Sequence, residues 1–463
     1  MSAPSRNSFL DGPIPVIFAK TALPIIFVMS MNGFLTVADA LFLGHYVGER
    51  ALAAVTLVFP LYMLIVAFST LVTGGMSSLV ARHLGGGRFD EAETVFAGAQ
   101  WLALMASLAI MALYLAFGGP AVLMAAGGDA DLAAMSATYL SIMVFTTPLM
   151  FVLSVNVDAL RNEGHVTSMA MAGLIVTISN VGFNYVLIAL FGMGVAGSAW
   201  GTVLAQALAF VLVVGFRLWR RTTLRPGSVF RHVTASAWPR ILALGAPMSL
   251  NFIGAALSTT ALLAALQMSG VADYATTVSA YGIITRITTF TFLPLLGLSQ
   301  AMQTITGNNY GAEHWQRVGA SLRFALVSTF VFCLGLEMVM VLFAPALGRM
   351  FVSDPGVVSE VGRILPIMVA LYALAGPLMM LGGHFQAIGD AGRAALLSLT
   401  KPYLFYIPLV FALAFGFGGE AIWWAGPCAD AFLLALAGLV LVDNARRHAL
   451  RFGLFGQPIG KPA

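Results

Sequence analysis

The stretch RLWRRTTLRPGSVFRHVTASAWPR, residues 217–240, is a long polar segment in an otherwise apolar chain. Of the 463 residues, 59% are hydrophobic and only 9% are charged, and the mean hydropathy is +0.92. A water-soluble protein of this length needs far more polar surface than this composition supplies. Apolar runs of roughly 20 residues, the length at which a helix spans a bilayer, recur on both sides of the stretch. The chain is therefore predicted to be a helical membrane protein.

Six apolar segments precede this linker and six follow it, so twelve membrane spans are expected. Their predicted ranges are residues 15–43, 51–80, 92–117, 132–160, 166–191, 194–219, 238–268, 274–305, 317–343, 358–387, 392–415 and 420–445. The chain is therefore expected to consist of an N-terminal lobe (residues 1–225), a basic cytoplasmic linker (residues 226–240) and a C-terminal lobe (residues 241–463). The cysteines Cys333 and Cys428 both lie inside apolar runs, which indicates two small core residues and no disulfide framework.

The positive charges predict how the chain is oriented. Of 23 Lys and Arg residues, 19 are assigned to the termini or to the connections on the same side as the termini. Arg50, Arg349 and Arg363 fall on the opposite side, and Arg286 falls within a span. The positive-inside rule then places both termini in the cytoplasm. Anchoring on anionic lipid headgroups explains the basic linker, so no nucleic-acid partner is expected.

The two halves of the sequence resemble each other at an offset of about 225 residues. Three pairs of segments show this: HLGGGRFDEAETV (83–95) with NYGAEHWQRVGA (309–320), ALRNEGH (159–165) with FQAIGDA (385–391), and GMGVAGSAW (192–200) with GFGGEAIWW (416–424). Because each half has an even number of spans, both halves have the same topology, which is a parallel repeat. The expected fold is an all-α membrane protein of twelve transmembrane helices, in two six-helix lobes around a central cleft. Such an architecture suits alternating access.

Three longer segments carry a resemblance to a known family. They are NGFLTVADALFLGHYVGERALAAVTLVFPL (32–61), PLLGLSQAMQTITGNNYGA (294–312) and FQAIGDAGRAALLSLTKPYLFYIPL (385–409). In this order and spacing they make the chain resemble the multidrug and toxic compound extrusion (MATE) family over nearly its full length. The resemblance implies proton- or sodium-driven export of amphipathic organic compounds, often cations, and no enzymatic activity.

Polar residues inside the spans are candidate functional groups, because a charge near the bilayer centre costs at least ~2.5 kcal/mol. Asp39 lies about four residues before the outer end of the first span. Asn180 and Asn184 in the fifth span share one helix face, and Thr202 in the sixth span lies at a similar depth. The sequence therefore predicts a polar cluster in the outer half of the N-terminal lobe.

The family resemblance implies that Asp39 is the residue that binds the coupling cation, with Asn156, Asn180 and Thr202 as its partners. The sequence departs from the family where Asn184 stands in place of a second acid, and where Ala255 stands in place of a glutamate in the seventh span. One carboxylate with amide and hydroxyl partners suits either Na⁺ bound at Asp39 or a proton on Asp39, so the ion stays open. The alternatives are a helix-capping role for Asp39 and interhelical hydrogen bonding for the two asparagines.

The second half has its own ionisable residues within the predicted spans, namely Arg286, Glu337 and Asp430. An unpaired buried charge costs more than a paired one, so a carboxylate–guanidinium pair is expected among them. The alternative is that they contact substrate in the cleft or take part in coupling. Gln300 and Gln303 lie on one helix face and are candidates either for lining the cleft or for interhelical hydrogen bonds.

The function that the family resemblance implies is a secondary active multidrug exporter. It is expected to be a monomer in lipid, to carry small amphipathic organic cations, and to need no cofactor besides the coupling ion. The alternative is a lipid-linked precursor flippase of a related superfamily branch, which usually has more spans or a strongly cationic cleft. A hydrolase is disfavoured because the sequence contains neither an HExxH motif nor a G-x-S-x-G elbow.

Overall fold

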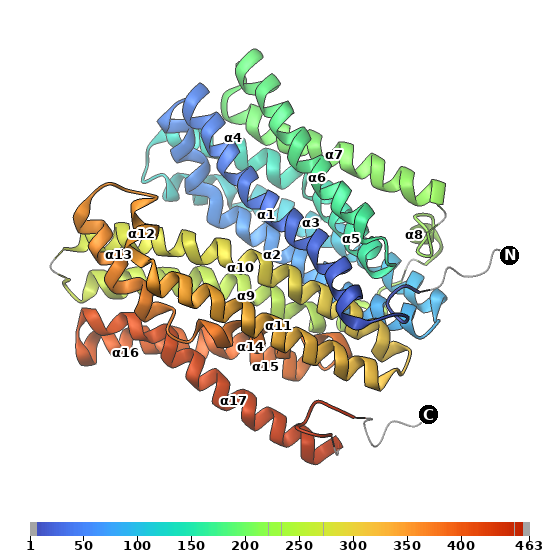
Figure 1. Ribbon diagram of the computed structural model, residues 1–463. Coiled ribbons are helices and arrows are strands. Elements are labelled where there is room, and N and C mark those ends of the chain that lie inside the picture. Colours follow the sequence, from blue (N-terminus) through green and yellow to red (C-terminus); the bar gives the residue numbers. More distant parts are fainter. Residues whose placement is uncertain (1–6, 221, 233, 272, 449, 457–463) are drawn as a thin grey trace. The chain divides into compact units, whose positions relative to one another are not determined.

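The computed structural model describes residues 7–220, 222–232, 234–271, 273–448 and 450–456, and these residues form helices and no β-strand (Figure 1). The first half contains α1 (Ile14–Tyr46), α2 (Glu49–Gly85), α3 (Phe89–Ala125), α4 (Ala130–Phe145), α5 (Thr147–Asn162), α6 (Val166–Asn184), the π-helical η1 (Tyr185–Leu190), α7 (Gly194–Arg220) and α8 (Ser228–Arg231). The second half contains α9 (Trp238–Met268), α10 (Tyr274–Gly311), α11 (Trp315–Leu342), α12 (Ala344–Arg349), α13 (Pro355–Met368), α14 (Tyr372–Ile388), α15 (Ala391–Thr400), the π-helical η2 (Lys401–Tyr406), α16 (Ile407–Phe417), the 3₁₀-helical η3 (Gly419–Trp424) and α17 (Ala425–His448).

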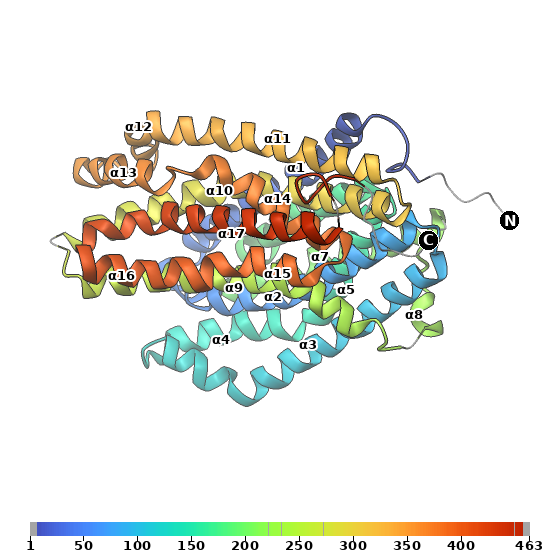
Figure 2. The ribbon, with the colours of Figure 1, turned by 90° about the horizontal axis from the view of Figure 1, so that it is seen from below.

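The chain forms two compact units. The first unit consists of Met1–Asp11 and Leu23–Ser249, and the second unit of Gly12–Ala22 and Leu250–Ala463. The chain passes between the units at three places: just before α1, inside α1 close to Pro24, and inside α9 close to Pro247. Within the second unit, α17 packs along α16 and η2 (Figure 2).

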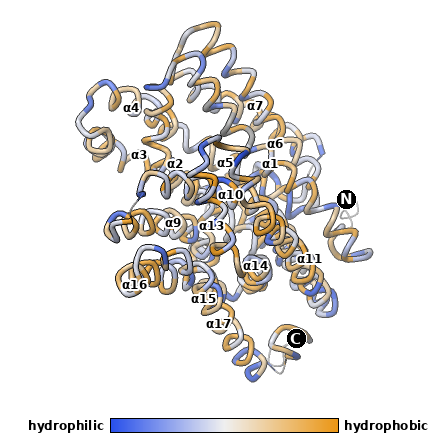
Figure 3. The backbone as a smooth tube through the Cα atoms, turned by 60° about the vertical axis from the view of Figure 1, so that its left-hand side comes forward, coloured by the Kyte–Doolittle hydropathy of each residue, from blue (hydrophilic) through white to orange (hydrophobic). Residues whose placement is uncertain are grey.

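Ten helices of the described part of the chain are long and apolar enough to cross a membrane, and two bent helix pairs raise the number to twelve. The bent pairs are α4 with α5 and α13 with α14, each with an angle of 49°. Hydrophobic residues run along most of each helix, and many hydrophilic residues gather at the helix ends (Figure 3). The protein is thus an integral membrane protein of the predicted helical class, and its helices coincide with the twelve predicted spans to within a few residues, apart from the longer ends of several helices.

The break between α4 and α5 is built from local residues. The hydroxyl of Thr146 donates to the carbonyl of Ile142, and the hydroxyl of Thr147 donates to that of Val144, each over 2.7 Å. Pro148 stands in the first turn of α5, where the missing N–H of a proline costs nothing. The free carbonyls at the end of α4 are therefore satisfied within the break itself.

The break between α13 and α14 is held by a neighbouring helix instead. The residue at the N-cap of α14 is Leu371, whose side chain cannot accept a hydrogen bond. The Glu337 carboxylate on α11 takes that place and accepts from the backbone N–H of Ala373 over 2.6 Å. The hydroxyls of Tyr372 and Thr291 also meet at 2.8 Å beside the break. A residue distant in sequence thus supplies the cap of α14.

Two glycines bring α2 and the first turns of α9 close together in the first unit. A Cβ atom on Gly245 would lie 1.7 Å from the backbone oxygen of Leu71, and one on Gly75 would lie 1.9 Å from that of Ile241. Small residues at such contacts allow close helix packing in lipid, where van der Waals contact replaces the hydrophobic effect. These two positions therefore accept no side chain unless the backbone moves.

We predict that Gly245→Ala lowers the free energy of unfolding by about 1–3 kcal/mol, the range typical of overpacked cores. The measurement is thermal unfolding of the purified protein in detergent. The matched control is Gly215→Ala on α7, where no atom lies within 4 Å of the added methyl group. The control is expected to leave stability unchanged or slightly raised, because alanine favours a helix over glycine. Equal melting temperatures for the two variants would contradict the prediction.

Candidate functional site

The structure brings four of the predicted residues together in the first unit: Asp39 on α1, Asn180 and Asn184 on α6, and Thr202 on α7. We call these four residues the Asp39 cluster. Asn184 Nδ2 donates to Asp39 Oδ1 over 2.5 Å, and Asn180 contacts Thr202 Oγ1 at 2.9 Å. Asn180 and Asn184 are fully buried, and Asp39 is half-buried. The i, i+4 spacing on α6 and the pairing of α6 with α7 bring these side chains together.

The amide of Asn180 fits this place in two orientations. In the first, its nitrogen donates to Thr202 Oγ1 and its oxygen accepts from Asn184 over 3.0 Å. In the second, its nitrogen donates to Asp39 Oδ1 over 3.0 Å, while its oxygen accepts from both the N–H and the hydroxyl of Thr202. The second orientation satisfies both amide atoms, so Asp39 receives N–H donors from two asparagines.

The side-chain oxygen of Asn184 is buried and has no hydrogen-bond partner among the described residues. A Cβ atom on Gly201 of α7 would lie 2.0 Å from this oxygen, so glycine makes room for it. Tyr62 of α2 and Tyr139 of α4 lie within electrostatic reach of Asp39. The sequence reasoning missed Gly201 and both tyrosines, because only the fold brings them to Asp39.

This arrangement offers oxygen ligands to a hard monovalent cation. A carboxylate, an unpartnered amide oxygen and a hydroxyl are the kinds of ligand that such cations prefer. The same carboxylate can instead accept a proton, after which it donates to a neighbouring amide oxygen. No group of three or more His, Cys, Asp or Glu residues suited to a metal ion occurs in the described part of the chain.

We predict that Gly201→Ala disturbs the cluster, because the added methyl group takes the space of the Asn184 amide. The Asp39 carboxylate then loses the hydrogen bond that it accepts from the Asn184 amide, and a hydrogen bond to a charged group is worth about 1.5–3 kcal/mol. Thermal unfolding measures this loss, and a structure of the variant shows the turned amide. The matched control is Gly182→Ala on α6, where no atom lies within 4 Å of the new methyl group. An unmoved Asn184 in the Gly201→Ala variant would contradict the prediction.

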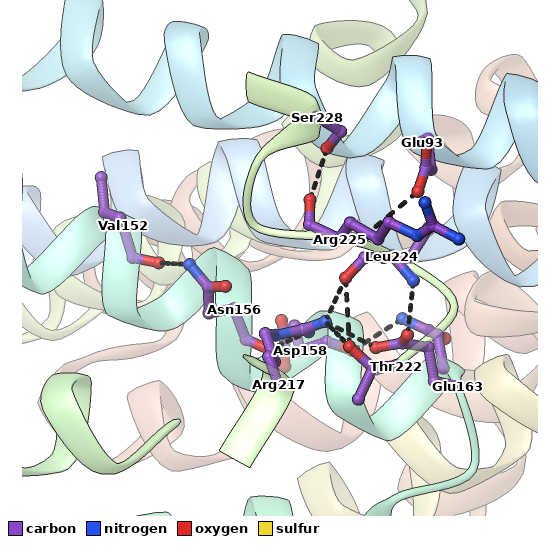
Figure 4. A network of polar contacts seen from close by, with 11 residues as sticks. Glu93, Val152, Asn156, Asp158, Glu163, Arg217, Thr222, Leu224, Arg225 and Ser228 are labelled. Atoms are coloured by element: carbon purple, nitrogen blue, oxygen red, sulfur yellow. Dashed lines mark hydrogen bonds and ion pairs between the residues drawn. The ribbon is translucent and has the colours of Figure 1, made fainter. Parts of the chain in front are cut away.

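The structure places Asn156 in a different network of polar contacts (Figure 4). Its amide nitrogen donates to the carbonyl of Val152, and its own carbonyl accepts from Arg217, each over 2.8 Å. Neither bond reaches the Asp39 cluster. The nearby Asp158 pairs with Arg161 at 2.8 Å. Asn156 lies near the end of α5 that contacts the linker, and it is therefore at a different depth from Asp39.

The centre of this network is a fully buried ion pair between Arg217 at the end of α7 and Glu163 after α5, with an N–O distance of 2.8 Å. Glu163 also accepts from the backbone N–H of Leu224 over 2.7 Å, and Arg217 donates to the carbonyl of Leu224 over 2.9 Å. Burial raises the pKa of the Glu163 carboxyl, and the Arg217 guanidinium and the Leu224 N–H oppose that rise by stabilising the charged form. The pair therefore ties the start of the linker to the end of α5.

Further contacts hold the linker along α3. The indole of Trp101 donates to the carbonyl of Val229 over 3.1 Å, and the indole of Trp238 donates to that of Gly98 over 2.9 Å. Glu93 accepts from the backbone N–H of Arg225 over 3.3 Å. The sequence signalled only a basic loop here, because backbone contacts of this kind leave no pattern in the residue types.

We predict that Arg217→Met destabilises the protein by about 3–5 kcal/mol, because it leaves the Glu163 carboxylate buried without its partner. The measurement is thermal or denaturant unfolding in detergent. The matched control is Arg220→Met, one helical turn further along α7, where the exposed guanidinium lies over Trp219. That control is expected to change stability by less than about 0.5 kcal/mol. A similar loss of stability in both variants would contradict the prediction that the buried ion pair contributes more than the exposed Arg220.

The carboxylate–guanidinium pair expected in the second half is not formed. Arg286 is exposed, Glu337 caps α14, and Asp430 pairs with Lys401 at a distance of 2.5 Å. The expectation was wrong because it considered Arg286 alone as the cation, whereas Lys401, inside the span formed by α15, η2 and α16, is the partner of Asp430. Of the two predicted glutamines, Gln303 is buried and Gln300 is half-buried.

Comparison with known proteins extends these observations. The family model described as MatE matches the chain twice, over residues 24–186 and 247–412. A probable multidrug resistance protein of Bacillus subtilis is 22% identical over 402 residues, which cover 85% of this chain and 86% of the relative. An FAD transporter of Shewanella oneidensis is 24% identical and covers 87% of this chain and 89% of the relative.

A solved outward-facing multidrug resistance MATE transporter superposes with a TM-score of 0.85 at 20% sequence identity. The alignment covers 95% of this chain and 97% of that structure, which shows a shared fold. The double match of the family model also agrees with the internal repeat read from the sequence, since the matches start 223 residues apart and end 226 residues apart. The two matches together cover most of the chain, and the chain therefore belongs to the MatE family of multidrug and toxic compound extrusion transporters.

Proposed function

We propose that this protein is a secondary active multidrug exporter. It couples the efflux of amphipathic, often cationic organic compounds to the inward movement of H⁺ or Na⁺ by alternating access. The observation that carries the proposal is the Asp39 cluster, a carboxylate with neutral polar partners inside a membrane-spanning unit. An ionisable residue inside the membrane costs free energy, and such residues usually belong to an ion or substrate pathway.

Asp39 is the residue that binds the coupling cation. With Na⁺, the ligands are a carboxylate oxygen of Asp39, the free side-chain oxygen of Asn184 and the hydroxyl of Thr202. Asn180 holds the carboxylate from the other side through its amide N–H. These groups are neutral apart from Asp39, so one monovalent cation neutralises the cluster.

With H⁺, the Asp39 carboxylate binds the proton directly and becomes neutral. A protonated Asp39 becomes a hydrogen-bond donor, and the short contact with the Asn184 amide suits a donor on Asp39 if that amide turns its oxygen toward it. Either ion changes the same hydrogen bonds between α1 and α6. The cation thereby favours one arrangement of these helices over another, which is the differential affinity that alternating access requires.

The remaining parts of the proposal concern the cellular setting. We propose that the protein works as a monomer in the lipid of a bacterial inner membrane, with both termini in the cytoplasm. The excess of positive charge in the connections on the side of the termini supports this orientation. The names of two relatives, a multidrug resistance protein and an FAD transporter, define the compounds to test first.

We predict that Asp39→Asn abolishes cation-coupled transport, because an amide neither binds a proton nor neutralises Na⁺. The measurement uses proteoliposomes with an imposed pH or sodium gradient at constant voltage, with each gradient collapsed separately. A fluorescent organic cation and FAD serve as test substrates. The coupled rate is expected to fall at least about tenfold, the effect of roughly 1.4 kcal/mol.

The matched control is Asp131→Asn, which neutralises a carboxylate that is 83% exposed in the same unit. That variant is expected to transport at the wild-type rate. Retention of the wild-type coupled rate by Asp39→Asn would overturn the coupling role of Asp39. The gradient whose collapse stops transport by the wild-type protein identifies the ion.

A further inference from the structure

A second carboxylate lies within the membrane-spanning helices of the second unit, and it has its own cation. Asp430 on α17 pairs with Lys401, the first residue of η2, with 2.5 Å between Oδ1 and Nζ. The Asp430 side chain is 11% exposed and that of Lys401 is 34% exposed. Among the described residues, Asp430 Oδ1 has no hydrogen-bond partner besides this ion pair. The ammonium of Lys401 therefore balances the charge of Asp430.

The internal repeat places this pair on the same spans as the Asp39 cluster. The span of α15, η2 and α16 is the counterpart of α6, and α17 is the counterpart of α7. The counterpart of α1 is α9, and Tyr403 of η2 donates to the carbonyl of Leu250 on α9 over 2.8 Å. The second unit thus has its ion pair on its fifth and sixth spans, the counterparts of two of the three spans that build the Asp39 cluster.

The depth of the two clusters also agrees. With an offset of about 225 residues, Lys401 falls four residues before the counterpart of Asn180, and Asp430 falls three residues after the counterpart of Thr202. Because these two spans run in opposite directions, both shifts point toward the same end of the unit and amount to about one helical turn of 5.4 Å. The flexible four-carbon stem of Lys401 covers a similar distance, so its ammonium can reach the depth that corresponds to the Asp39 cluster.

The chemistry of the two clusters differs in one respect. Among the described residues, the hydrogen bonds of Asp39 come from neutral amide groups, whereas Asp430 pairs with the ammonium of a lysine in the same chain. The other titratable groups on this part of η2 and α17 are Tyr403, Tyr406 and Cys428, and residues 250–268 of α9 include no charged side chain. Tyr403 is bonded to Leu250, and Tyr406 packs near Gly426. α14 also packs against α17 and carries the buried His384. Among the described residues, Lys401 is the cation that forms an ion pair with Asp430.

We propose that Lys401 is a tethered cation, which permanently occupies in the second unit the kind of site that an exchangeable H⁺ or Na⁺ occupies in the first. The inference rests on the proposed coupling role of Asp39. It makes Asp430 a latent cation site that the lysine keeps closed. The transporter then exchanges one cation per chain, at Asp39.

The test removes the ammonium and keeps the apolar stem, as Lys401→Met. In the purified full-length protein, bound sodium is counted with radioactive Na⁺ by equilibrium dialysis. Proton uptake is measured by potentiometric titration as the difference from the wild-type protein. We expect Lys401→Met to bind one more cation than the wild type, and the double variant Lys401→Met with Asp430→Asn to return to the wild-type number. Lys401→Arg, which keeps the charge, is the matched control and is expected to gain none.

A variant that folds poorly still gives a decisive result through its melting temperature. A ligand that binds the native state stabilises it, so the melting temperature of Lys401→Met should rise more steeply than that of the wild type with Na⁺ concentration or with acidification. An unchanged cation number together with an unchanged dependence of the melting temperature would overturn the tethered cation. Asp39→Asn separates this outcome from failure of the proposed function. If Asp39→Asn loses a cation while Lys401→Met gains none, only the tethered cation is refuted.

Discussion

A charge inside or at the edge of the hydrocarbon layer must be balanced at short range, and several acids of the chain show how this is done. Four carboxylates meet it in four ways. Asp39 has two asparagine amides, Glu163 has a guanidinium, Glu337 has the backbone N–H at a helix break, and Asp430 has an ammonium. The partner decides what each acid can do. Cations neutralise Glu163 and Asp430, whereas the neutral partners of Asp39 and Glu337 leave the carboxylate charge uncompensated.

The spans could be predicted from the sequence because their signal is local. Length and hydropathy define a membrane helix, and the basic residues and turns mark its ends. The two bent spans show the limit of that signal. The break after α4 has threonines and a proline beside it, while the cap of α14 comes from Glu337, 36 residues earlier in the chain. A contact between distant residues leaves no mark in either segment.

The site was predictable in part for the same reason. The spacing of Asn180 and Asn184 on one helix face, together with matching depths, correctly brought Asp39 and Thr202 to them. The pair of Asp430 and Lys401 was not predicted, because the long stem of a lysine can reach a carboxylate on another helix and leaves no pattern in the sequence. Gly201 could not be found at all, because its role is to leave space for the Asn184 oxygen.

The sequence predicts that the basic linker after α7 contacts lipid headgroups, and in the structure indole, guanidinium and carboxylate groups also bind it to α3 and α5. A segment held by these contacts cannot extend unless some of them break. For engineering, this makes residues 222–232 a poor place for a fusion partner or a protease site, although they form one of the most polar connections of the chain.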